Sequence, residues 1–64
     1  MSPEAETRRH MAVAHAAAQT AAERIQWANS AHGSDVAHWA ESAGWWYQHA
    51  MANYDIAESW RRVS

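Results

Sequence analysis

A single helix stop near the middle of the chain constrains the fold more than any other feature. Across 64 residues the only proline is Pro3, and the two glycines are Gly33 and Gly44. Gly33 lies in the run His-Gly-Ser-Asp at 32–35, where glycine suits the left-handed position just past a helix. The serine and aspartate that follow it can cap a second helix. The sequence therefore predicts a turn at 32–35 between two segments of nearly equal length.

Both segments favour helix. The chain begins with Ser2-Pro3-Glu4, which combines a capping serine, a proline at the first helical position and an acid in the first turn. Residues with high helix propensity follow, and no period-2 strand pattern appears. We expect an all-α fold, a two-helix antiparallel hairpin forming one domain over 1–64, with helices over about 3–31 and 35–62.

Small and aromatic residues recur at heptad spacing along both segments. Small residues let two helices approach closely while tryptophan fills the gaps between layers, so this spacing predicts the packing face. In the first segment the positions are Met11, Ala14, Ala18, Ala21, Ile25 and Ala28. In the second they are Val36, Ala43, Ala50 and Ala57, alternating with Trp39, Trp46, Asn53 and Trp60.

A lone hairpin of this composition would bury little apolar area. The chain has sixteen alanines, neither leucine nor phenylalanine, and a length near the lower limit for a self-sufficient core. Self-association, most simply as a two-fold dimer that forms a four-helix bundle, would cover the aromatic side chains. The expected self-association core consists of Met11, Ala18, Ile25, Trp39, Trp46, Tyr47, Tyr54 and Trp60.

Three adjacent aromatics, Trp45, Trp46 and Tyr47, cannot all face one way on a helix. Trp46 and Tyr47 fall on the packing face, so Trp45 points away from it, on a second apolar stripe. Exposed tryptophan is enriched at interaction hot spots, and this predicts a surface that binds another protein. Packing inside a larger homo-oligomer, or a tolerated exposed stripe, is the alternative. The expected partner-binding residues are His38, Trp45, His49 and Ile56.

The five histidines, at 10, 15, 32, 38 and 49, include no pair three or four residues apart. The spacing that places two imidazoles on one helical face is therefore missing, and we expect no metal site and no cofactor. His15 is expected in the core, hydrogen-bonded to Tyr54 or to a symmetry mate. A His-based haem- or metal-binding bundle, with paired His15 residues across a dimer axis, is an alternative. No nucleophile with a supporting base appears, so we expect no enzyme activity.

The charged residues favour no particular partner. The formal net charge is −2, which gives no general attraction to nucleic acid or to anionic membranes. Four arginines nevertheless gather where the two chain ends meet, and a dimer would bring such clusters together. The hairpin resembles in size and shape the small plasmid copy-number regulators of the Rop type, which are dimeric four-helix bundles that bind RNA; it shares no motif with them. That resemblance implies an alternative function, a nucleic-acid-binding regulator that uses Arg8, Arg9, Arg61 and Arg62.

The paired arginines near the start also resemble a twin-arginine export signal. The segment after them is mostly alanine and contains His15 and Gln19, so we interpret it as part of the first helix and expect a cytoplasmic protein without a membrane segment. The function expected from the sequence is that of a small self-associating accessory, adaptor or regulatory protein, which binds another protein through its aromatic second face.

Overall fold

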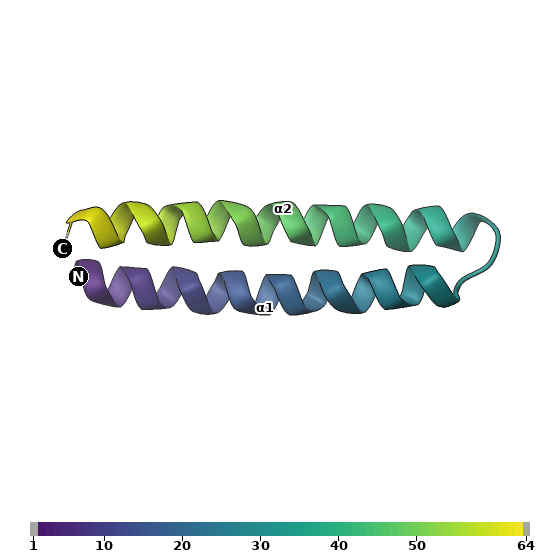
Figure 1. Ribbon diagram of the computed structural model, residues 1–64, viewed down its shortest axis with the longest axis horizontal. Helices are drawn as coiled ribbons and strands as arrows, with labels where there is room; N and C mark the ends of the chain where they lie inside the picture. The colour runs from purple at the N-terminus through teal and green to yellow at the C-terminus, as the bar shows by residue number, and fades with distance from the viewer. Residues whose placement is uncertain (1, 64) are drawn as a thin grey trace.

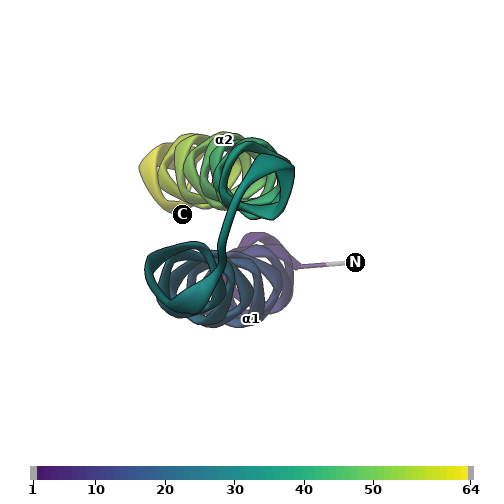
Figure 2. The same cartoon turned by 90° about the vertical axis from the view of Figure 1, so that its right-hand side faces the viewer.

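The computed structural model describes residues 2–63; Met1 and Ser64, the ends of the expected 1–64 domain, lie outside the described residues. Two helices make up the fold, α1 (Pro3–Ser30) and α2 (Ser34–Val63). They run antiparallel in a single layer, with both chain ends at one end of the hairpin (Figures 1 and 2). The Cα trace measures 48 × 13 × 12 Å. The expected all-α antiparallel hairpin is confirmed, and neither helix is long and apolar enough, within residues 2–63, to cross a membrane.

The start of α1 has the expected cap. The Ser2 side-chain oxygen accepts a hydrogen bond from the N–H of Ala5 at 3.1 Å, and the Ser2 carbonyl accepts one from Glu6 at 3.1 Å. Pro3 occupies the first helical position, where its missing N–H costs nothing because that group has no partner inside the helix. The cap and the proline together fix where α1 begins.

The end of α1 differs slightly from the expectation. The cap residue is Ala31, in an extended conformation, and its N–H donates to the carbonyl of Ala28 at 3.3 Å. Gly33 has the expected left-handed backbone, with φ of 62°. It lies two residues past the cap instead of next to it. His32 therefore takes part in the turn as well.

The start of α2 relies on backbone groups. The helix begins at Ser34, so Ser34 and Asp35 lie in its first turn. The N–H groups of Asp35 and Val36 donate to the carbonyls of His32 and Gly33, each at 3.3 Å. The two carbonyls of the turn thus satisfy donors that a helix start leaves without intrahelical partners.

The seam between the helices is built from alanine. Among the described residues, the buried apolar ones are all alanines: Ala14, Ala17 and Ala21 on α1, and Ala43, Ala50 and Ala57 on α2. Such small side chains allow close helix approach but supply little apolar area each. Most of the larger apolar side chains therefore lie along the two flanks of the seam.

On α1 this seam is rotated from the predicted one. Ala17 is buried where the heptad spacing predicted Ala18, and Ile25 is 52% exposed where it was predicted to pack. Half-buried Arg24 takes the seam position beside it. The prediction was wrong because alanine occupies seven of the eleven positions from 12 to 22, so the pattern contains little contrast between faces.

His15 and Tyr54 link the two helices across the seam. The Tyr54 hydroxyl and His15 Nδ1 are 2.9 Å apart, and the rings meet edge to face with centroids 5.5 Å apart. The predicted hydrogen bond is confirmed. His15 is exposed, however, so its prediction as a core residue was wrong for the single hairpin. The pair lies at one edge of the seam because His15 comes one residue after buried Ala14.

Candidate functional site

One flank of the hairpin carries the residues predicted to bind a partner. We call it the aromatic face and define it by His38, Trp45, His49 and Ile56 of α2. All four are exposed, and Trp45 is 59% exposed. They follow one another at spacings of seven or four residues, which keeps them on one side of the helix. Val13 and Trp27 of α1 also have large exposed apolar side chains.

Neighbouring rings hold Trp45 in place. It stacks on His49, with centroids 5.4 Å apart and an interplanar angle of 10°. It also meets Trp46 edge to face at 4.8 Å, and Trp46 in turn meets His49 at 6.0 Å. Trp46 is half-buried against the seam, so the exposed indole of Trp45 rests on a ring that is itself packed. The exposed indole is therefore oriented before any partner arrives.

A second aromatic cluster lies closer to the turn, and the sequence did not reveal it. The Arg24 guanidinium carbon lies 4.1 Å from the ring centroid of Trp27 and 5.6 Å from that of Trp39. The two indoles meet edge to face at 4.7 Å, and His38 meets Trp39 at 4.7 Å. The spacing of Arg24 and Trp27, three residues apart on one helix, is the local signal that predicts half of this cluster. The contact with Trp39 comes from the hairpin fold.

The opposite flank is hollowed. A groove of about 430 Å³ opens there near the turn, and we call this side the groove face. Tyr47 and Ile25, at its rim, are 60% and 52% exposed. Tyr47 was predicted to pack; it comes four residues after buried Ala43, which places it beside the seam. The residues that line the groove are Ile25, Ala28, Asn29, Val36, Ala40, Ala43, Gly44 and Tyr47.

The residues expected to form the self-association core divide between the two flanks. Trp39 and Trp46 contact residues of the aromatic face, and Trp60 shares their heptad position on α2. The others lie toward the groove side of the seam: Met11, Ala18, Ile25, Tyr47 and Tyr54. Apart from Ile25 and Tyr47, all eight are half-buried. Within one hairpin they form two separate groups.

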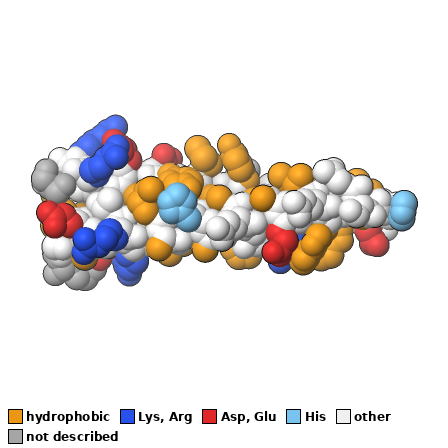
Figure 3. Space-filling model, turned by 60° about the horizontal axis from the view of Figure 1, so that its bottom comes forward, with side chains coloured by type: hydrophobic (Ala, Val, Ile, Leu, Met, Phe, Trp, Pro, Cys, Tyr) orange, Lys and Arg blue, Asp and Glu red, His pale blue; other side chains and the backbone are white. Residues whose placement is uncertain are grey.

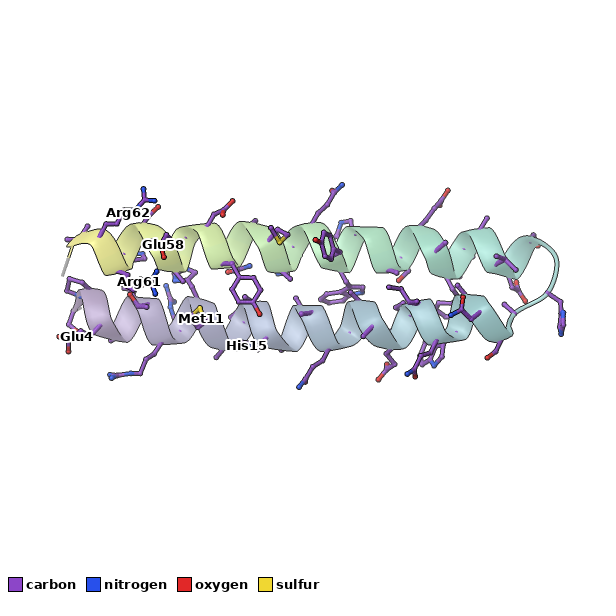
Figure 4. All side chains as sticks on the ribbon, in the orientation of Figure 1. Glu4, Met11, His15, Glu58, Arg61 and Arg62 are labelled. Carbon is purple, nitrogen blue, oxygen red and sulfur yellow. The ribbon has the colours of Figure 1, made fainter. Side chains whose placement is uncertain are left out.

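The arginines considered for nucleic acid lie at the open end, where acids accompany them (Figures 3 and 4). Arg9 donates to the buried carboxylate of Glu6 at 2.7 Å. Arg61 also pairs with Glu58, and Arg62 lies 3.6 Å from the same carboxylate. Arg8 is exposed. The open end therefore presents both signs of charge close together.

Within residues 2–63, no group of three or more histidine, aspartate or glutamate side chains is placed to hold a metal ion. A histidine site would need side chains from a second copy, as the haem or metal alternative requires. No protein-family model, curated protein or solved structure matches this chain.

Proposed function

We propose that this chain is a small self-associating helical accessory, adaptor or regulatory protein, acting in the cytoplasm, that binds another protein through its aromatic face. The observation that carries the proposal is the exposed, oriented indole of Trp45, stacked on His49 and resting on Trp46. Tryptophan is among the residues that contribute most to binding when a partner buries them.

The surroundings of Trp45 support a protein partner. An aromatic side chain buries about 150–250 Å² when a partner covers it, and here the ring's orientation is already restricted by its neighbours. His38, His49 and Ile56 add a mixed rim of polar and apolar groups around the anchor. Such a centre with a partly polar rim is typical of protein interfaces.

Binding of nucleic acid is less well supported by the charges. Arg9, Arg61 and Arg62 all contact carboxylates, and the formal net charge is −2. Phosphate binding by such a surface would require those ion pairs to exchange partners. We therefore place the protein-binding proposal first.

The test is photo-crosslinking in the cells that make the protein. A photoreactive residue at position 45 should yield a discrete adduct with one protein, while the same residue at exposed Gln19 of α1 should not. With the partner identified, Trp45→Ala should weaken its affinity by about 30-fold, the loss of a typical hot spot of ~2 kcal/mol. Gln19→Ala is the control and should bind normally.

Three results would contradict the proposal. They are equal crosslinking at both positions, unchanged affinity for Trp45→Ala, and an adduct that consists of RNA or DNA. In the last case, binding should fall steeply with added salt.

A further inference from the structure

Gly44 has no local reason to be glycine. It lies in the interior of α2, where glycine costs stability relative to alanine, and its backbone is not left-handed. A Cβ atom built there would meet nothing within 4 Å. Gly44 lines the floor of the groove together with Ala40 and Ala43. Because these residues have a small side chain or none, the backbone of another helix can approach this part of α2 closely.

The side of the hairpin that carries the groove has few charged residues, and none of them lines the groove itself. It extends from Met11 to Asn29 on α1 and from Val36 to Tyr54 on α2. Three charged residues lie inside those ranges: Glu23, Arg24 and Glu41. Arg24 packs on Trp27 and Trp39 on the opposite flank, and Glu41 is exposed one turn before Gly44, outside the groove lining. Beyond this stretch, at the open end, both signs of charge gather (Figure 3). Figure 4 shows Glu4 and, on α2, Glu58 and Arg61 at that end, with Met11 and His15 further along α1.

We propose that the occupant of the groove face is a second copy of this chain, packed antiparallel across a two-fold axis at the level of Gly44. The part of α2 on this side of the hairpin, 36–54, is centred within one residue of Gly44, so an axis at that level places it over its own copy. The charged open ends then project past the partner's turn and keep their contact with water. An axis at this level thus leaves no charged group of the open end to be desolvated.

The shape of the face is self-complementary, which a two-fold interface requires. Ile25 and Tyr47 protrude from the rim, while Ala40 and Gly44 form the hollow beside them. A two-fold axis lying across the helices at Gly44 sets α2 antiparallel to the partner's α2. Tyr47 of each copy then lies at the level of exposed Glu41 in the other, one residue from Ala40.

The available area is sufficient for a stable pair. The part of α2 from 36 to 54 is ~28 Å long at 1.5 Å per residue, and two packed helices are ~20 Å wide. Face-to-face packing would cover on the order of 550 Å² on each copy, or about 1,100 Å² in total, just above the ~1,000 Å² of a specific interface. The inference rests on the self-association clause of the proposed function and assigns it a surface.

The test uses single cysteines, because the chain contains none. Across a two-fold axis at Gly44, Gly44→Cys places two thiols within the short distance that a disulfide spans. Under mild oxidation it should form a disulfide-linked dimer roughly 100-fold faster than Gln48→Cys, because the pairing acts as a raised local concentration. Gln48 is exposed one helical turn beyond Gly44, so across the same axis the two Gln48 positions lie ~12 Å apart along the helices.

A bulk substitution provides the second arm. Gly44→Leu should raise the dimer dissociation constant about 100-fold in sedimentation equilibrium, because it fills the hollow that the partner enters. Ala52→Leu, which places the same leucine side chain at an exposed site on the other flank, should leave it unchanged. If the chain associates but both cysteines crosslink equally and Gly44→Leu still dimerises, the inference is overturned and self-association stands. If the wild-type chain sediments as a monomer, both fail, and binding through Trp45 remains a separate question.

Discussion

The two flanks of the hairpin both expose large side chains, but they hold them differently. On the aromatic face, Trp45 stacks on His49 and rests on Trp46, so its indole is supported from below and from the side. On the groove face, Tyr47 and Ile25 stand at the rim of a hollow whose floor is alanine and glycine. One surface is a supported projection, and the other pairs projections with a cavity.

That difference teaches how two exposed apolar surfaces on one small protein can have separate uses. A supported projection fits a pocket on a different molecule, because it offers no matching hollow of its own. A face that contains both projections and hollow fits a copy of itself. We therefore assign the aromatic face to a protein partner and the groove face to self-association, and the following substitutions test that assignment.

The largest contrast is expected between the adjacent indoles. Trp46→Ala should lower the free energy of unfolding by roughly 2–3 kcal/mol, less than the ~3–5 kcal/mol of a fully buried tryptophan because Trp46 is half-buried. Trp45→Ala should cost less than about 1 kcal/mol, the loss of ring contacts alone. Urea denaturation followed by circular dichroism, at one protein concentration, measures both. Equal losses would mean that Trp45 is part of the core.

The next contrast is between the seam and the aromatic face. Ala50 is only 2% exposed between the helices, so Ala50→Leu should force them apart and cost about 1–3 kcal/mol. Ala52→Leu places the same bulk on an exposed position two residues away and should change stability by less than ~0.5 kcal/mol. If thermal melting of the two variants is indistinguishable, the helices do not approach as closely as the alanine seam implies.

Gly44→Ala should have an effect whose sign depends on protein concentration. In the separate hairpin the added methyl group meets nothing and raises helix stability by about 1 kcal/mol. In the associated form it obstructs the partner's approach. Melting curves over a dilution series should show the variant more stable than wild type when dilute and less favoured when concentrated. A constant advantage at every concentration would remove Gly44 from the interface.

The smallest expected effect concerns the cluster near the turn. Arg24→Ala should cost about 0.5–1 kcal/mol, because it removes the guanidinium from the faces of Trp27 and Trp39. Its ion pair with Glu23, the exposed residue before it, adds little. Arg24→Lys keeps the charge but lacks the flat stacking surface, so it should recover only part of the loss. Full recovery with lysine would show that charge alone matters there.

The fold was accessible from the sequence because its determinants are local. Ser2 and Pro3 start α1, and Gly33 is left-handed in the turn, as their chemistry predicts. The hydrogen bond between His15 and Tyr54 also followed, because an antiparallel hairpin places these positions at the same level. The helix-capping residues and a turn near the middle of the chain were enough to predict these features.

The candidate surfaces were accessible only in part. His38, Trp45, His49 and Ile56 are exposed on one flank, and simple helix periodicity groups them. The groove and the pairing of Arg24 with Trp39 depend on the rotation of α1 about its own axis. That rotation is not encoded in a run of alanines, where Ala17 and Ala18 offer the same methyl group to a neighbour. The exposed position of Trp45 could therefore be predicted from the sequence, but the groove could not.

The measurement that tests the central assignment most directly is native mass spectrometry of Gly44→Leu and Trp45→Ala beside the wild-type chain. Wild type and Trp45→Ala should be dimers, each with twice the mass of its own chain and nothing else bound. Gly44→Leu should be a monomer. The reverse pattern, a monomeric Trp45→Ala and a dimeric Gly44→Leu, would contradict the assignment by showing that the chain associates through its aromatic face.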